Sequence, residues 1–428
     1  MADSSNPTTK NPWWWIPTLY YTQGIPYIIV VTVSIIMYKD LGISNARLAL
    51  FTSLLALPWA LKPLWSPFVD VFKTKRWWTY MMQGLIGIGF IGAAIAMQTP
   101  YFFEVSLFFL FLVAFASSTH DIAADGFYML ALSDDRQSFF VGIRSTFFRL
   151  AMWSGEGLLV VLAGVLTVRT MDSGFAWTVV LGMVASTMIL MFGYHQRMLP
   201  YPLEDAPAEK ANESPLQAVW STIAEFLKKD QILLAVTFVL LYRFGEGQLV
   251  KMAAPFLMDS VEAGGLGLSV TDVGYINGVI GLLALTAGGI LGGIVISRHG
   301  LKAWLWPMIG IMNLPNLAYW YLAANQPENF WIISSLVGIE KFGYGFGFTA
   351  FLMFLIYIAR GPFKTAHYAF GTALMAFGMS IPGAISGLVQ EAIGYEYFFI
   401  WILVSALPII IITPFIRIEA DFGKKKDD

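Results

Sequence analysis

Long apolar stretches separated by short polar turns fill most of the 428-residue chain. A helix of about 20 apolar residues spans the hydrocarbon core of a bilayer, so windows of that length mark candidate membrane spans. Twelve such windows lie near residues 15–38, 47–70, 77–98, 103–132, 140–168, 175–196, 232–258, 270–297, 303–324, 329–359, 365–390 and 395–416. The pattern predicts an all-α integral membrane protein with twelve transmembrane helices.

One long polar segment divides the predicted spans into two sets of six. It opens with Pro200, Pro202 and Pro207 and continues as SPLQAVWSTIAEFLKK, where apolar residues recur at helical spacing. We interpret it as a cytoplasmic linker with an amphipathic helix on the membrane surface. The predicted organisation is an N-terminal tail (1–14), a six-helix bundle (15–196), the linker (197–230), a second six-helix bundle (231–417) and a C-terminal tail (418–428).

Composition supports the membrane class and excludes several partners. Hydrophobic residues make up 57% of the chain and charged residues 13%, against about 25% charged in soluble domains. The net charge of −2 gives no reason to expect a nucleic-acid partner, and the absence of cysteine excludes disulfides and thiolate chemistry. The polar residues 1–12 lack a cleavable signal pattern, so we expect the first span to be retained.

Lysine and arginine placement predicts the orientation. With both termini inside, 18 basic residues fall on the cytoplasmic side and three (Lys39, Arg47 and Arg169) fall on the opposite side. The other five lie deep within predicted spans. Cytoplasmic N- and C-termini therefore fit the chain best.

Two loops at corresponding positions suggest that the halves are repeats. PLWSPFVDVFKTKRW follows the second span and contains Asp70, and GGILGGIVISRHGLKAW follows the eighth and contains Arg298. We expect both residues to act in gating or conformational change. Parallel repeats around a central cavity are the layout of major facilitator transporters.

Carboxylates inside the predicted spans are the main functional candidates. Asp121 and Asp125, in SSTHDIAADGFYM, lie four residues apart and so share one helix face. Each costs about 2.5–3.5 kcal/mol at the bilayer centre, and such residues usually mark transport or proton pathways. Because two ionised carboxylates repel, a proton carrier that cycles between charged and neutral states fits the pair, with Asp125 preferred. Glu340 and Glu246 are further proton-coupling candidates, whereas His120 points to another face.

The deep charges balance in number, which predicts pairing around a protein-lined cavity. The acidic members are Asp121, Asp125, Glu156, Glu246 and Glu340, and the basic members are Lys62, Arg149, Arg243, Lys251 and Lys341. We expect three of the cations to hold an anionic substrate group: Lys62, Arg149 and Arg243. Four aromatic residues near these charges are candidates to stack on a sugar or ring: Tyr20, Tyr128, Trp153 and Tyr344.

Structural roles remain alternatives for each group. The acid pair could be tied to Lys62 or Arg149, and Arg243 could pair locally with Glu246 three residues later. Glu340 and the adjacent Lys341 are not expected to share a face. Glycines 343, 345 and 347 suggest a packing seam.

Missing motifs exclude other energy sources and chemistries. The chain has no G-x-x-x-x-G-K-[ST] pattern, so ATP is not expected to drive it, and no cofactor beyond a proton gradient is predicted. It also lacks H-E-x-x-H and G-x-S-x-G, so an enzyme is not expected. No metal site is predicted.

Six segments resemble one family. They are LPWALKPLWSPFVD, HDIAADGFYM, FRLAMWSGEG, LYRFGEG, LGGIVISRHGL and GIEKFGYGFGFTAFLMFL. Together they resemble the AmpG-type muropeptide permeases of the major facilitator superfamily. The D-I-A-x-D-G element is also similar to the related acetyl-CoA transporters.

The resemblance implies a proton-driven importer of the bacterial inner membrane. Its substrates would be cell-wall turnover products, N-acetylglucosaminyl-1,6-anhydro-N-acetylmuramic acid with or without peptide. The family's acid pair corresponds to Asp121 and Asp125, its span-2 lysine to Lys62, its span-5 arginine to Arg149 and its span-10 acid to Glu340. His120 departs from an expected Gln, and Glu246 departs from the usual Asp.

The expected partners are thus a small glycan or glycopeptide, protons and the lipid bilayer, with the protein a monomer. An acetyl-CoA, organic-anion or other sugar transporter is the alternative within the superfamily. A membrane enzyme acting on lipid-linked sugars is the alternative from another class.

Overall fold

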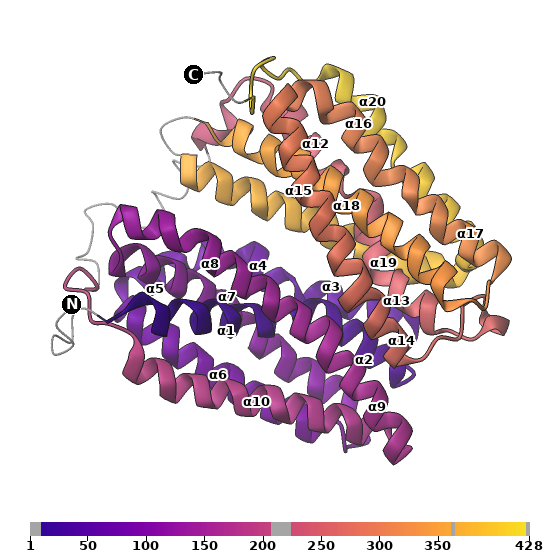
Figure 1. Ribbon diagram of the computed structural model, residues 1–428, viewed down its shortest axis with the longest axis horizontal. Coiled ribbons are helices and arrows are strands. Elements are labelled where there is room, and N and C mark those ends of the chain that lie inside the picture. The colour runs from indigo at the N-terminus through magenta and orange to yellow at the C-terminus, as the bar shows by residue number, and fades with distance from the viewer. Residues whose placement is uncertain (1–9, 207–223, 361–363, 425–428) are drawn as a thin grey trace. The chain divides into compact units, whose positions relative to one another are not determined.

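The computed structural model describes residues 10–206, 224–360 and 364–424, and every regular element in these ranges is a helix (Figure 1). Nine helices in the described ranges are long and apolar enough to cross a membrane. The predicted amphipathic helix over residues 214–229 falls largely outside the described residues. The all-helical membrane class predicted from the sequence is confirmed.

The chain divides into two compact units. The first unit contains residues 1–41 and 61–215. Its helices are α1 (Ile16–Ile28), α2 (Ser34–Asp40), α5 (Ser66–Val71), α6 (Lys75–Ala96), α7 (Phe102–Ala131), α8 (Asp134–Trp153), α9 (Val160–Thr170) and α10 (Ser173–Met198). Within it α6 packs between α7 and α10, and α1 packs along α8.

The second unit contains residues 42–60 and 216–428. Its helices are α3 (Asn45–Leu55), α12 (Ile232–Tyr242), α13 (Phe244–Met258), α14 (Val270–Tyr275), α15 (Leu282–His299), α16 (Leu301–Asn313), α17 (Leu317–Asn325), α18 (Phe330–Ala359), α19 (Lys364–Ser405) and α20 (Leu407–Ile412). The short α4 (Leu57–Leu61) lies at the boundary. Although α3 comes from the first half of the sequence, it packs on α19 and α13.

Several predicted spans are broken into shorter pieces. The predicted span 47–70 consists of α3, α4, the 3-10 turn Lys62–Leu64 and α5, and the predicted span 303–324 consists of α16, a 3-10 turn and α17. Conversely, α19 runs through two predicted spans, with a kink at Gly394 (φ +75°). The count of twelve crossings and the bundle boundaries remain predictions.

The breaks have local causes. Pro58, Pro63 and Pro67 interrupt the second predicted span, because proline lacks an N–H and its ring clashes with the preceding turn. Pro26 inside α1 is followed by a π-helical turn over Ile29–Val33. Another π-helical turn, Ser154–Leu159, joins α8 to α9. Backbone irregularity inside a membrane protein is tolerated only where other protein groups or a cavity satisfy it.

Glycines allow α15 and α18 to approach closely. A Cβ on Gly288 would meet the Phe342 carbonyl oxygen and lie 2.9 Å from the Phe346 nitrogen. Gly345 on α18 faces α15 in the same way, with the Gly289 nitrogen 3.1 Å from its Cβ position. The glycines of α18 thus form the packing seam that the sequence suggested.

Gly288→Ala should therefore destabilise the second unit. The added methyl group has to push α18 away, and such overpacking costs about 1–3 kcal/mol. We expect a lower thermal unfolding midpoint in detergent for this variant. Gly293→Ala on the same helix is the control, because nothing lies within 4 Å of its Cβ position, and it should be neutral or stabilising. Equal midpoints for the two variants would contradict the close approach.

Candidate functional site

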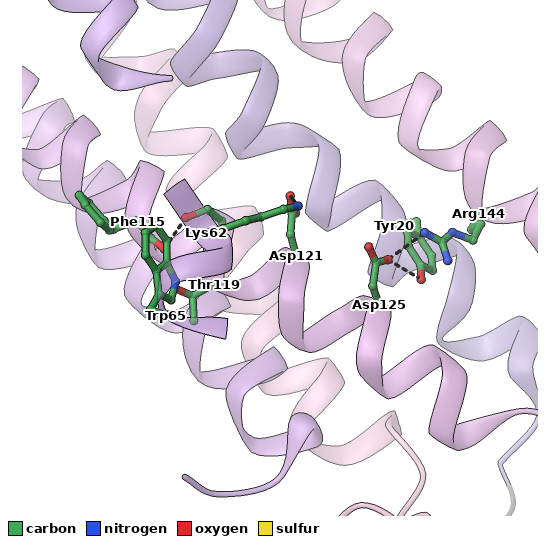
Figure 2. A network of polar contacts seen from close by, with 9 residues as sticks. Tyr20, Lys62, Trp65, Phe115, Thr119, Asp121, Asp125 and Arg144 are labelled. Carbon is green, nitrogen blue, oxygen red and sulfur yellow. Dashed lines mark hydrogen bonds and ion pairs between the residues drawn. The ribbon is translucent and has the colours of Figure 1, made fainter. Parts of the chain in front are cut away.

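The acid pair of α7 lies beside two cations of the first unit (Figure 2). Lys62 Nζ is 3.6 Å from Asp121 Oδ2, and the Asp121 side chain is 13% exposed. Lys62 begins the 3-10 turn between α4 and α5, so the broken helix places it opposite α7. Nearby, Trp65 Nε1 donates to Thr119 Oγ1 at 3.1 Å and ties the same segment to α7.

Asp125 pairs with Arg144 of α8. Arg144 Nη2 is 2.8 Å from Asp125 Oδ1, and the Tyr20 hydroxyl donates to the same oxygen at 3.2 Å. The guanidinium carbon of Arg144 lies 4.4 Å from the Tyr20 ring centroid and 4.9 Å from that of Tyr128. Cation–π contacts at these distances hold the guanidinium in place. Each acid thus has its own cation.

Arg144 is a site residue that sequence reasoning missed, because it was counted among the cytoplasmic loop residues. The expected partner on this helix, Arg149, is instead exposed on α8, and Trp153 is 42% exposed. The sequence distances of Asp125 and Arg144 from the connection between α7 and α8 could have identified Arg144 as the partner. Asp125 and Arg144 both lie within about three turns of that connection, so antiparallel packing brings them close.

His120 points away from Asp121 and into the packed interior of the first unit. His120 Nε2 and Gln83 Nε2 are 2.9 Å apart, His195 Nδ1 and Gln83 Oε1 are 2.8 Å apart, and His195 Nε2 lies 3.0 Å from Thr18 Oγ1. His120, Gln83 and His195 are all buried. This chain links α7, α6, α10 and α1, so it is a structural connection between four helices.

In the second unit, Arg243 lies at the break between α12 and α13. Its Nη2 donates to the Tyr344 hydroxyl, and its guanidinium carbon lies 4.9 Å from the Phe348 ring centroid. The alternative of a local hydrogen-bonded pair with Glu246 is not seen, because both Glu246 oxygens lack a hydrogen-bond partner among the described residues. Arg243 itself is the non-helical residue (φ −109°, ψ 18°) between the two helices.

Two acids of the second unit are fully enclosed. Both oxygens of Glu246 and of Glu340 are buried without a hydrogen-bond partner among the described residues. Glu340 nevertheless has an ion-pair partner, since Lys341 Nζ lies 3.4 Å from its Oε2. The expectation that these adjacent residues would not meet is wrong, because the long lysine side chain folds back along its helix.

The predicted gating residues lie at helix ends. Asp70 belongs to α5, but its side chain is outside the described part of the structure. Arg298 is exposed in the last turn of α15. Within the described ranges, no group of three His, Cys, Asp or Glu side chains could hold a metal ion.

The pairing of Asp125 with Arg144 can be measured by a double-mutant cycle. We expect Asp125→Asn and Arg144→Gln to be coupled by about 0.5–1 kcal/mol in unfolding free energy, since the pair is partly exposed. The control cycle combines Asp121→Asn with Arg144→Gln and should give coupling near zero. Coupling of equal size in both cycles would contradict the separate pairing of the acids.

The histidine chain should matter for stability. Gln83→Leu leaves ring nitrogens of His120 and His195 without partners, and each unsatisfied group costs about 1–3 kcal/mol. We expect a clearly lower thermal unfolding midpoint than for Gln98→Leu, where an exposed glutamine bonds Thr178. Equal effects of the two substitutions would argue against a structural role for the hydrogen bonds that join His120, Gln83 and His195.

Comparisons with known proteins agree with this architecture. The sequence profile of the Major Facilitator Superfamily matches residues 22–387. The chain is 24% identical to the anhydromuropeptide permease of Escherichia coli (strain K12), covering 96% of this chain and 80% of that protein. It is also 24% identical to the putative transporter AmpG 4 of Rickettsia conorii, and the match covers 93% of this chain and 95% of that protein. The resemblance inferred from the six segments is thus confirmed.

Solved structures share the fold. The nucleoside transporter NupG gives a TM-score of 0.70 at 17% identity, with 93% of this chain and 98% of that chain covered. A D-xylose-proton symporter gives a TM-score of 0.65 at 12% identity, with 96% and 98% covered. Because the family profile spans most of the sequence, the chain belongs to the Major Facilitator Superfamily and is a multi-pass membrane transporter, not an enzyme.

Proposed function

We propose that the protein imports anhydromuropeptides together with protons across the bacterial inner membrane, as a monomer with both termini in the cytoplasm. The relatives named for anhydromuropeptide or AmpG transport support the cargo. The excess of basic residues in the predicted cytoplasmic loops supports the orientation. The proton role rests on the acids of both units.

The main observation that supports this proposal is that the two acids of α7 pair with different cations. Lys62 lies beside Asp121, and Arg144 lies beside Asp125. Protonation of Asp125 removes its negative charge and releases Arg144 to attract a carboxylate of the cargo. Proton uptake and substrate binding are then linked, because one cation serves either the protein's acid or the cargo's acid.

The second unit supplies a further pair of proton candidates. Glu246 and Glu340 are both buried in the second unit. A buried carboxylate costs several kcal/mol unless it is paired or protonated. Proton exchange at Glu246 or Glu340 would therefore accompany the change of access from one side of the membrane to the other.

The remaining candidates concern the cargo. Lys62, Arg149 and Arg243 are proposed to attract its anionic groups, and Trp153 and Tyr344 to pack on its sugar rings. Tyr20 and Tyr128 already contact Arg144, so in this structure they position that cation. Asp70 and Arg298 remain proposed gating residues.

Uptake by proteoliposomes tests the proton role. Under an imposed pH gradient, Asp125→Asn should lower accumulation of radiolabelled anhydro-disaccharide by about tenfold or more, because its site no longer exchanges a proton. Counterflow exchange without a gradient should persist, since it needs binding and reorientation but no net proton movement. Glu246→Gln is likewise expected to lower gradient-driven accumulation and to retain counterflow exchange.

Glu419→Gln is the matched control, because Glu419 is an exposed acid paired with Arg360. It should leave both assays unchanged. Gradient-driven accumulation that survives in Asp125→Asn, Asp121→Asn, Glu246→Gln and Glu340→Gln would refute proton coupling at these acids. Wild-type uptake of acetyl-CoA in place of the disaccharide would refute the cargo class.

A further inference from the structure

Lys251 is a deep cation that the proposed mechanism does not use. It lies on α13, and only 5% of its surface is exposed. Its Nζ donates to Thr52 Oγ1 of α3 at 3.1 Å. No carboxylate in the described residues forms an ion pair with it. The other deep lysines, Lys62 and Lys341, both have acidic partners.

The Lys251 ammonium has more hydrogen-bond donors than the described residues around it accept. An ammonium group has three N–H donors, and Thr52 accepts one of them. The Thr52 hydroxyl itself donates to the Leu48 carbonyl oxygen at 2.8 Å. The neighbouring Ser53 hydroxyl is buried and has no hydrogen-bond partner among the described residues.

Gly383 of α19 lies against both Lys251 and Ser53. A Cβ on Gly383 would lie 3.3 Å from Lys251 Cγ, 3.2 Å from Ser53 Oγ and 2.9 Å from the Gly247 carbonyl oxygen. The stem of Lys251 and the Ser53 hydroxyl therefore pack against the same glycine of α19. A side chain at position 383 would collide with both of them and with the Gly247 carbonyl oxygen.

An unbalanced ammonium inside a membrane protein is costly, and such groups pair with one another or mark a substrate path. A carboxylate is the complementary ligand, because its two oxygens accept several hydrogen bonds and its charge cancels that of the ammonium. The two remaining N–H groups of Lys251 and the Ser53 hydroxyl would supply three donors. Among the described residues no carboxylate pairs with Lys251, and a carboxylate of an acidic cargo has the complementary charge and acceptors.

Helix α3 covers the site in this structure. Its first residue, Asn45, donates to Gln390 Oε1 at 2.7 Å and to Asp259 Oδ2 at 3.2 Å, which fastens α3 to α19 and to the end of α13. Residues on both sides of the 42–60 segment belong to the first unit. Withdrawal of α3 would break these bonds and expose Lys251 from the end of α13 that the basic-residue count places outside the cytoplasm.

We propose that Lys251 binds a carboxylate of the incoming cargo when α3 withdraws from α13, and that the Ser53 hydroxyl of α3 joins it as a second donor when α3 returns. This proposal rests on the import of an acidic saccharide proposed above. The carboxylate then replaces Thr52 as the main partner of the ammonium. Return of α3 closes the site over the neutralised pair.

Binding to the full-length protein in detergent tests the proposal. The two probes are the anhydro-disaccharide with its free lactyl carboxylate and the methyl ester of the same compound, titrated by tryptophan fluorescence. The wild type should bind the acid about tenfold or more tightly than the ester. Lys251→Met should clearly reduce this preference while keeping its affinity for the ester, with any remaining preference due to the other proposed cations.

Three variants separate binding from structure. Thr52→Val removes the present partner of Lys251 and should keep the acid preference, whereas a purely structural bond predicts that it behaves like Lys251→Met. Lys302→Met, at an exposed lysine, should change nothing. Lys251→Gln keeps a donor for Thr52 and replaces Lys251→Met if the latter does not fold.

The outcomes distinguish this proposal from the proposed function. An acid preference as large as that of the wild type in both Lys251 variants overturns the proposal and leaves the cargo class intact, as does equal wild-type affinity for acid and ester. If the wild type binds neither probe, the cargo class fails. Lactate and lactamide then replace the probes in thermal-shift assays. Stabilisation by lactate alone that disappears in Lys251→Met supports the carboxylate site, and identical responses overturn it.

Discussion

Charge in hydrocarbon must be balanced inside the protein, and much of this structure follows from that constraint. A bare ion at the bilayer centre costs several kcal/mol, so each deep charge needs a partner from the protein or from a ligand. Asp121 pairs with Lys62, and Asp125 pairs with Arg144. Glu340 pairs with Lys341. These contacts place the acids that we propose for proton coupling beside cations of the same unit.

Three of the deep charged residues lie at interruptions of the helices. Lys62 begins a 3-10 turn, Arg243 separates α12 from α13, and Glu156 lies in a π-helical turn. Broken helices are a common way for transporters to build binding sites, because they place side chains and unsatisfied backbone groups at membrane depth. Proline causes the first break, and the glycine-rich segments around the other two permit close packing.

The two units handle their charges differently. In the first, the acids of α7 are each held by a cation, and a cation–π contact fixes one of the cations. In the second, within the described ranges, Glu246 lacks a hydrogen bond and Lys251 donates to Thr52. Paired groups can exchange one partner for another, whereas we propose that Lys251 accepts a partner from the cargo. This difference supports the proposal that the paired acids of the first unit exchange protons and that Lys251 of the second unit binds an anion.

The sequence by itself determined the helical membrane class, the family resemblance and the helices that carry the deep charges. Apolar length and spacing are properties of one helix, and they place Asp121 and Asp125 on one face of α7 without knowledge of any neighbour. Only the tertiary structure decided the partners: Arg144 in place of Arg149, Tyr344 in place of Glu246 for Arg243, and α3 against α13 and α19. A partner depends on the rotation and offset of two packed helices and on the reach of a flexible side chain, and the periodicity of a single helix contains neither.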